Sequence, residues 1–415
     1  MRILLSAYAC EPGKGSEPEV GWNWAVELAR QGHWVTVLTR GNNRTTIEPA
    51  HAHLQLSNLS FVYYDLPRWA SWWKKGSRGV QLYYLLWQWG LLRYVRRKQV
   101  AHGADLVHHI TFGAFRPATR LGALRLPLVV GPIGGGETTP SAFIGTFPWK
   151  GRVIEYMRRL GNRLFLLDPA LHRMLAQSTV VLCRTPQTMA ALPMRYRAKC
   201  VVQPEDAVSP SWIASDPSAN RSRELLYAGR LLYWKGIHLA ITALARARRD
   251  EPALRMAIVG RGPDARWLQR TAASLGIEDA ITWHDWLPQD ALRQKYRQAL
   301  ALVFPSLHDS GGTVAREALA AGTPVLCLKT GGPAEIVPPD AGFVIDCDKG
   351  VELTIQAMAQ AMLRLIREPE LVQQLGANAI CHSRHRGWAT AVDRAYQHLA
   401  APLSQPPESS HAWTS

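Results

Sequence analysis

Short runs of apolar residues recur along the chain and alternate with segments whose apolar positions follow the helical period. A run such as Val325–Leu328, apolar at every position, is typical of a strand buried on both faces of a parallel sheet. Helical spacing then follows a loop, as in Val20–Arg30 after the first run. The pattern predicts strands at Ile3–Ala7, Val35–Leu38, Phe61–Tyr64, Asp105–Ile110, Leu128–Val130, Val180–Cys183, Val201–Val202, Leu225–Tyr227, Arg255–Val259, Ile281–Trp283, Leu302–Pro305 and Val325–Leu328. We therefore predict an α/β fold.

The order strand, loop, helix occurs in two series, which predicts two doubly wound parallel sheets of the Rossmann type. Between the series, Gln203–Arg223 contains three prolines and several Ser and Asp residues, and we interpret it as a hinge. A length of 415 residues also favours more than one hydrophobic core. We expect an N-terminal domain over residues 1–205, a C-terminal domain over 206–385 and a disordered Pro/Ser tail over 403–415.

The charge of the chain is strongly positive and unevenly distributed. The formal net charge is +16. Residues 1–205 hold 26 Lys and Arg against 11 Asp and Glu, whereas residues 206–415 hold 22 against 21. A cationic excess confined to one half points to an anionic partner there: membrane lipid, a phosphorylated carrier, a polyanionic substrate or nucleic acid.

The six cysteines are scattered, without the CxxC or Cys/His spacing of metal sites. We therefore expect reduced, mostly buried thiols in a cytoplasmic protein. They are Cys10, Cys183, Cys200, Cys327, Cys347 and Cys381. The sequence shows no signal peptide and no run of about 18 uncharged apolar residues, so we expect no membrane-spanning helix.

The segment 68–100 interleaves aromatic rings with cations. Such a mixture suits a membrane–water interface, where rings lie at headgroup depth and cations meet anionic lipid. A partly buried helix with a basic end is an equally open interpretation. Nucleic acid is less favoured, because no DNA- or RNA-binding module is recognisable. The residues concerned are Trp69, Trp72, Trp73, Lys74, Lys75, Arg78, Tyr83, Tyr84, Trp87, Trp89, Arg93, Tyr94, Arg96, Arg97 and Lys98.

The stretch Ser306–Glu335 carries the clearest pattern of ligand-binding residues. Two glycine pairs, Gly311–Gly312 and Gly331–Gly332, each precede a helix-prone segment. Backbone N–H groups at helix starts bind anions, and glycine lets a ligand approach the backbone closely. The acids Asp309 and Glu317 on either side of the first turn suit hydroxyl groups, because a carboxylate accepts hydrogen bonds from them. The stretch therefore predicts a site for a nucleotide, a sugar or both.

Three further loops follow predicted strands. In Gly229–Gly236, Arg230 and Lys235 flank a strand-to-helix turn, where two cations and helix N–H groups would clamp a diphosphate. The loop Gly13–Gly15 is either a ligand cradle or a plain tight turn. The loop Gly260–Pro263 is a weak signal by itself, because it lacks a third glycine at dinucleotide spacing.

Two adjacent histidines, His108 and His109, end the predicted strand Asp105–Ile110. Neighbours in a strand face opposite ways, so only one of them can face the ligand-binding edge. The glycines of Gly131–Glu137, after the next strand, mark close backbone approach, either to a ligand or to another segment.

Taken together, these motifs resemble the retaining GT-B glycosyltransferases of the family 4 group, and the likeness extends over nearly all of residues 1–400. In the C-terminal half it rests on GR-x4-KG, on the GxGP loop, on Pro305–Ser306 and on an acid-x7-acid motif followed by A-xx-AGTPV. In the N-terminal half the sequence resembles members of polysaccharide assembly at SE-xx-VGW (Ser16–Trp22), HHIT (His108–Thr111), FRP (Phe115–Pro117) and GPIGGGE. The resemblance implies two Rossmann-like domains facing across a cleft, with a helix within residues 386–402 that returns to the N-terminal domain.

The resemblance also implies roles for individual residues. Arg230 and Lys235 match the pair that neutralises the donor pyrophosphate, and Glu317 matches the acid that binds the ribose. Asp309 matches the acid on the donor sugar, where the family usually has Glu, and SGGT follows where many members have GFGL. His109 matches the cleft histidine near the reacting carbon. The remaining positions on the donor side are Gly15, Ser16, Gly262, Gly311, Gly312, Thr313 and Val314.

These matches imply transfer of a sugar from a nucleotide-sugar donor to a lipid-linked or polysaccharide acceptor, with retention of configuration. We expect no cofactor and no metal, because cations and helix starts can stabilise a leaving diphosphate. The protein would then be cytoplasmic, with the segment 68–100 as a possible contact to the inner face of the membrane. The main alternative is a non-catalytic nucleotide-sugar or glycan-binding protein on the same scaffold.

Overall fold

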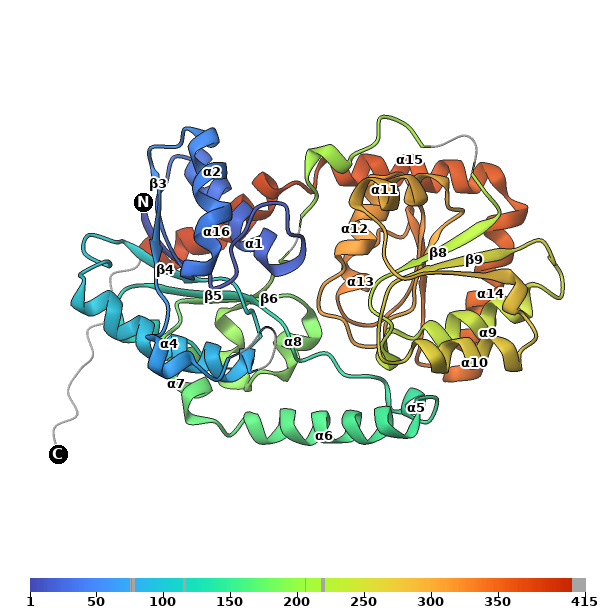
Figure 1. Cartoon of the computed structure of the whole chain (residues 1–415), viewed down its shortest axis with the longest axis horizontal. Coiled ribbons are helices and arrows are strands. Elements are labelled where there is room, and N and C mark those ends of the chain that lie inside the picture. The colour runs from blue at the N-terminus through green and yellow to red at the C-terminus, as the bar shows by residue number, and fades with distance from the viewer. Residues whose placement is uncertain (75, 77–78, 115–116, 206, 218–220, 405–415) are drawn as a thin grey trace.

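The structure is a computed structural model that describes residues 1–74, 76, 79–114, 117–205, 207–217 and 221–404. It contains two parallel sheets, each covered by helices on both faces (Figure 1). The predicted fold class, two doubly wound Rossmann-like domains of the GT-B type, is therefore confirmed. Of the expected tail over 403–415, residues 405–415 lie outside the described residues, and so do 115 and 116 of the FRP motif.

The first sheet has seven parallel strands in the order β3-β2-β1-β4-β5-β6-β7. The order reverses between β1 and β4, whose registers align Ser6 with His109. Apolar residues on successive positions of β1 enter the cores on opposite faces, as the unbroken apolar runs predict. The strands are β1 (Arg2–Ser6), β2 (Trp34–Thr39), β3 (Leu59–Tyr63), β4 (Leu106–His109), β5 (Leu128–Ile133), β6 (Val180–Cys183) and β7 (Cys200–Val202).

The second sheet has six parallel strands in the order β10-β9-β8-β11-β12-β13. Its order reverses between β8 and β11, so the helices that follow these two strands pack on opposite faces of the sheet. The strands are β8 (Glu224–Ala228), β9 (Arg255–Val259), β10 (Ile281–His284), β11 (Leu302–Phe304), β12 (Val325–Leu328) and β13 (Gly342–Ile345).

Helices fill the connections between these strands. In the first half they are α1 (Ser16–Arg30), α2 (Arg44–Leu54), α3 (Arg68–Ser71), α4 (Val80–Arg97), α5 (Ser141–Ile144), α6 (Trp149–Phe165), α7 (Pro169–Gln177) and α8 (Pro186–Ala191). In the second half they are α9 (Ile237–Ala247), α10 (Ala265–Ser274), α11 (Gln289–Gln298), α12 (Thr313–Ala320), α13 (Gly331–Ile336), α14 (Val351–Arg367), α15 (Pro369–Arg384) and α16 (Trp388–Ser404). Short 3-10 turns are η1 (Gly41–Asn43), η2 (Leu121–Leu124), η3 (Met194–Lys199), η4 (Pro210–Trp212), η5 (Tyr233–Lys235) and η6 (Glu278–Ala280).

The last helix, α16, packs on the first sheet although it follows the second in sequence (Figure 1). Val392, Ala395 and Leu399 are fully or almost fully buried in the core that α1 forms with the first sheet. The segment 203–223, which we call the linker, joins the two sheets, and the chain reaches α16 beside it, where Val208 and Gly387 form a parallel bridge. The two passages between the sheets therefore run together at this point.

The segment α5–α6 makes a second link between the domains. It lies between β5 and β6 in sequence, yet Phe143 and Phe147 are buried in the core of the second sheet with Tyr233. Burial of these aromatic rings holds the segment beneath both domains, along the lower edge of Figure 1. Within the described residues, no helix has both the length and the apolar character needed to cross a membrane.

Candidate functional site

The loops after β8 and β11 meet at the point where the second sheet reverses its strand order. In an open α/β sheet this point leaves a crevice at the carboxyl ends of the strands, where ligands bind. Lys235 comes from the first loop and Asp309 from the second, and Lys235 Nζ lies 2.5 Å from Asp309 Oδ2. Two residues predicted to hold the donor's phosphate and sugar thus form an ion pair at the crevice.

Glycines allow these two loops to approach so closely. Gly236 has a φ of +66°, and a Cβ at this position would collide with the carbonyl oxygen of Pro305. Gly331, which begins α13 after β12, packs against the second of these loops: its φ is +58°, and a Cβ there would collide with the carbonyl oxygen of Asp309. The backbone N–H of Gly332 also donates to that oxygen at 2.7 Å. The glycines therefore fix the backbone that carries the Lys235–Asp309 pair.

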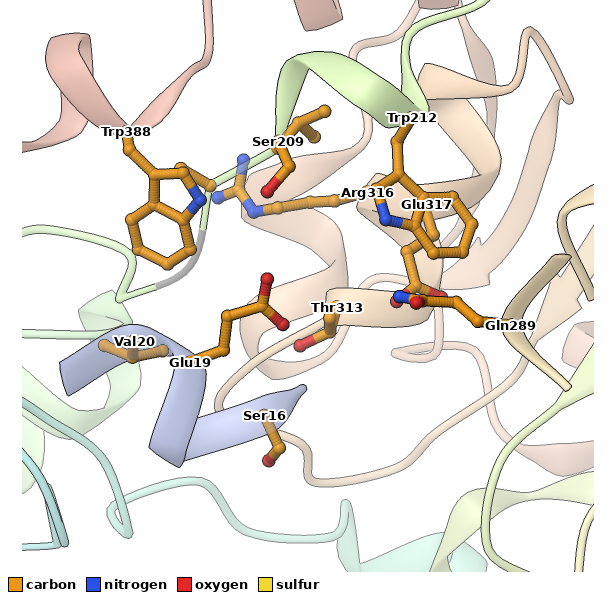
Figure 2. A pocket seen from close by; sticks show the side chains of 12 residues that line it. Ser16, Glu19, Val20, Ser209, Trp212, Gln289, Thr313, Arg316, Glu317 and Trp388 are labelled. Atoms are coloured by element: carbon orange, nitrogen blue, oxygen red, sulfur yellow. The ribbon is translucent and has the colours of Figure 1, made fainter. Parts of the chain in front are cut away.

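A pocket with an empty volume of about 450 Å³ opens beside α12, between the two domains (Figure 2). Its walls come from the start of α1, from the linker and from α12, so both domains contribute to it. The lining residues are Ser16, Glu19, Val20, Ala207, Val208, Ser209, Trp212, Gln289, Thr313, Arg316, Glu317 and Trp388. Ser16, Thr313 and Glu317 are the predicted donor-site residues among them; Lys235 and Asp309 are not part of this lining.

Glu317 is held in place by a residue that the sequence did not reveal. The hydroxyl of Tyr296 in α11 donates to Glu317 Oε2 at 3.0 Å. Burial, followed by the carboxylate of Glu317, raises the pKa of Tyr296 well above its ordinary value, so the hydroxyl stays a donor. The ring of Tyr296 in turn contacts Trp212 of the linker edge-on, at 6.2 Å between centroids. No motif marks Tyr296, and its hydrogen bond to Glu317 is what identifies it.

The other predicted donor-side residues are more dispersed. Arg230 is exposed at the end of β8, and its carbonyl oxygen accepts from the hydroxyl of Tyr227. A Cβ at Gly262 would collide with the backbone of Leu231, so close packing of the two loops already requires this glycine. Gly15 has a φ of +67° with open space around it, and Ser16 follows with a φ of +52°. This loop therefore has room for a ligand.

The glycine-rich turn before α12 packs closely against neighbouring segments at the crevice. Gly312 is buried, and a Cβ there would meet Ile336 of α13. A Cβ at Gly311 would lie 3.2 Å from an oxygen of Glu205 in the linker. Thr313 and Val314 begin α12, where backbone N–H groups without helical acceptors favour an anion.

His109 lies at the reversal point of the first sheet, but its ring is enclosed. Its Nε2 is 2.9 Å from the hydroxyl of Tyr84, and its Nδ1 is 3.1 Å from Ser6 Oγ. Burial, with a smaller effect of His108, lowers the pKa of His109 to about 3, so the ring is neutral near pH 7. His108 bonds the hydroxyl of Tyr396 and the carbonyl oxygen of Gly131. The catalytic role of His109 stays a prediction.

Arg184, directly after β6, joins both domains and the linker. Its guanidinium pairs with Glu17 at 3.0 Å and with Glu205 of the linker, and lies 3.4 Å from Ser310 Oγ in the loop of Asp309. Burial acts to lower the pKa of Arg184, but Glu205 and Glu17 outweigh it and raise the pKa. No sequence motif marks Arg184, because its partners come from three distant segments.

In the part of the chain that the structure describes, no three His, Cys, Asp or Glu side chains are arranged to hold a metal ion. The described charged groups include the Lys235–Asp309 pair at the crevice, and Arg230 is exposed in the loop after β8.

Known proteins resemble this chain in sequence and in structure. Residues 209–381 match the family described as Glycosyl transferases group 1. A D-inositol 3-phosphate glycosyltransferase from Corynebacterium glutamicum is 30% identical over 392 residues, which cover 89% of this chain and 87% of that protein. A relative of the same name from Streptomyces griseus is 36% identical over 189 residues, or 43% of this chain. The chain covers only 39% of the Streptomyces relative's length.

Two solved structures share the fold at low sequence identity. Anabaena HepE in complex with UDP and glucose has a TM-score of 0.60 and 19% identity, covering 97% of this chain and 100% of that chain. The catalytic domain of starch synthase IV from Arabidopsis thaliana, bound to ADP and acarbose, has a TM-score of 0.66 and 14% identity, covering 97% and 99%. The fold agrees with the family match to the C-terminal half of the chain and with the Corynebacterium relative, which matches nearly the whole chain. The chain therefore belongs to the family Glycosyl transferases group 1.

Proposed function

We propose that this protein transfers a sugar from a nucleotide-sugar donor to a lipid-linked or polysaccharide acceptor, with retention of configuration and without a metal ion. The observation that carries the proposal is the Lys235–Asp309 ion pair at the reversal point of the second sheet. It places a cation and a carboxylate beside α12, whose Glu317 lines the interdomain pocket. These are the groups that a sugar diphosphate and a ribose require.

In this proposal Glu317, oriented by Tyr296, accepts hydrogen bonds from the ribose hydroxyls. The diphosphate lies against the start of α12, with Lys235 and Arg230 as cations. Phosphate then competes with Asp309 for Lys235, which leaves the carboxylate of Asp309 free to accept from a hydroxyl of the sugar. The negative charge that grows on the leaving diphosphate is stabilised by Lys235.

Retention is checked on the product itself. The coupling constant of its anomeric proton, measured by NMR, should show the configuration of the donor. Binding of a nucleotide sugar with neither transfer nor hydrolysis would instead support the alternative of a non-catalytic binding protein.

A thermal-shift screen against UDP, GDP, ADP and their sugars tests the donor site. A ligand that binds only the native state raises the melting temperature, and at 100 times Kd it contributes about 2.7 kcal/mol. We expect one nucleotide to stand out, and we expect Glu317→Gln to weaken its binding roughly 10- to 100-fold, since hydrogen bonds to a charged group contribute about 1.5–3 kcal/mol. An exposed carboxylate of the same domain, changed in Glu352→Gln, is the control. Equal affinities of the Glu317→Gln and unmodified proteins would remove Glu317 from the donor site.

Metal independence has a direct test. We expect transfer rates in excess EDTA to equal those with added magnesium, because cationic side chains and helix N–H groups can supply the charge that a metal would. Loss of activity in EDTA that magnesium restores would contradict this part of the proposal.

The segment 68–100 remains a proposed contact to an anionic membrane, and its side chains are divided between surface and core. Trp69 and Trp72 are 80% and 77% exposed, and Trp89 is 45% exposed. Trp87 is fully buried, and Trp73 packs on Tyr83. Lys75 and Arg78 lie outside the described residues. The segment is therefore partly a core helix, α4, and partly an exposed aromatic surface.

A further inference from the structure

The helix α6 (Trp149–Phe165) carries a row of large apolar side chains on its outer side. Met157 is 68% exposed and Leu160 is 59% exposed, values unusual for apolar residues in the middle of a 17-residue helix. Leu167, two residues past the end of the helix, is 74% exposed as well. We call the row on the helix itself the α6 stripe, and it consists of Trp149, Val153, Tyr156, Met157, Leu160 and Leu164.

The stripe forms one continuous surface. At 3.6 residues per turn its six members fall within an arc of about 100°, and a 17-residue helix is about 25 Å long. Contiguous exposed apolar surfaces of this kind mark an interaction site. The surface is long and narrow, and it follows the helix axis from end to end.

The opposite side of α6 is fixed to the protein, so the stripe cannot turn inward. Gly151 is buried against the ring of Tyr233, where a Cβ would lie 2.9 Å from the ring. Glu155 is fully buried, 3.3 Å from Arg158 and 3.4 Å from His308 Nε2. Burial acts to raise the pKa of Glu155, but His308 and Arg158 outweigh it and lower the pKa to about 2. The carboxylate therefore stays charged and anchors the helix.

The charges on α6 select the kind of partner. The helix has five cations and one carboxylate, and that carboxylate is the buried Glu155. Lys150 borders the stripe on one side, and Arg152 and Arg163 border it on the other. An apolar band with exposed cations on both sides and no exposed acid is typical of a helix that lies in the plane of an anionic lipid surface.

We propose that α6 docks on an anionic bilayer, with the stripe turned toward the acyl chains and its flanking cations among the headgroups. This surface is distinct from the segment 68–100. The anchored side of α6 touches Tyr233 and His308, which belong to the two loops that carry Lys235 and Asp309. Docking through α6 would therefore hold the crevice at a fixed height above the membrane.

Vesicle flotation tests the proposal with vesicles of phosphatidylglycerol and phosphatidylcholine in equal parts, and with phosphatidylcholine alone. We expect the unmodified protein to float with the anionic vesicles. Replacing Met157, Leu160 and Leu164 with glutamine should lower the bound fraction at least tenfold. The matched control replaces one Met and two Leu that are also exposed, Met194, Leu275 and Leu353, with glutamine and should bind like the unmodified protein. Lys150→Gln with Arg163→Gln should weaken binding to the anionic vesicles only.

The outcomes separate the alternatives. Equal binding of the stripe variant and the unmodified protein would overturn the proposal, and so would equal binding to both kinds of vesicle. A dimer that the stripe substitutions convert to a monomer, with no vesicle binding, would identify the stripe as an interface between two copies. Light scattering measures this oligomeric state. Flotation needs no donor, so failure of the proposed transferase function leaves the test intact. Unchanged melting temperatures of the variants show that the fold is retained.

Discussion

Lys235→Ala is expected to lower the turnover number by about two to three orders of magnitude, the effect of removing one group that stabilises developing charge. Lys235 supplies the ammonium group at the reversal point of the second sheet, 2.5 Å from Asp309. Without it, the leaving diphosphate loses a cation that acts most strongly in the transition state. Steady-state kinetics should therefore show the loss mainly in kcat rather than in KM.

Two controls separate this effect from simple loss of an ion pair. Lys295 pairs with Glu224 at 3.2 Å in the same domain but outside the crevice, and Lys295→Ala should leave kcat within about twofold of the unmodified value. The double variant Lys235→Ala with Asp309→Asn removes the unpaired carboxylate as well, and it should stay as slow as the single variant. Undiminished turnover of Lys235→Ala would contradict the proposed site.

Arg184→Met should destabilise the protein by about 3 kcal/mol, because it leaves two carboxylates without their cation in a largely buried position. The Arg184 side chain is 9% exposed, and its partners Glu17 and Glu205 are 30% and 12% exposed. In a domain of about 200 residues this corresponds to a fall in melting temperature of roughly 6–12 °C. Calorimetry would detect it as an earlier transition.

The charges that Arg184→Met leaves behind can be removed in turn. Adding Glu17→Gln and Glu205→Gln to the Arg184→Met variant should recover part of the lost stability, since the two side chains that pair with Arg184 are then neutral. A melting temperature of the single variant within 1–2 °C of the unmodified protein would mean that solvent, rather than Arg184, stabilises these acids. Because Arg184 also reaches Ser310, the single variant is expected to lose some order in the loop of Asp309.

The strands were largely predictable because runs that are apolar at all or nearly all positions have few alternatives in a protein of this length. Val180–Cys183, Arg255–Val259 and Val325–Leu328 were predicted with the bounds that the structure has. The pairing of Lys235 with Asp309 was not visible from periodicity. It depends on β8 and β11 being neighbours, although β9 and β10 separate them in sequence.

The rest of the site depends on contacts between distant segments. Tyr296 reaches Glu317 from another helix, and Arg184 gathers partners from α1, the linker and the loop after β11. Composition alone could not divide the aromatic segment between surface and core, because Trp87 in α4 is buried whereas Trp72, just after α3, is exposed. Sequence order likewise did not show that Phe143 and Phe147 enter the core of the second sheet.

The path of α5 and α6 has a mechanical consequence. In the described part of the chain, the backbone passes between the two halves four times: before α5, after α6, through the linker and between α15 and α16. The last two passages run together at Val208 and Gly387, and the first two lie at the opposite edge of the molecule in Figure 1. A body held at two separated points can turn only about the line that joins them. We therefore expect the two halves to rotate relative to each other about this one line, and we expect twisting about other axes to be suppressed.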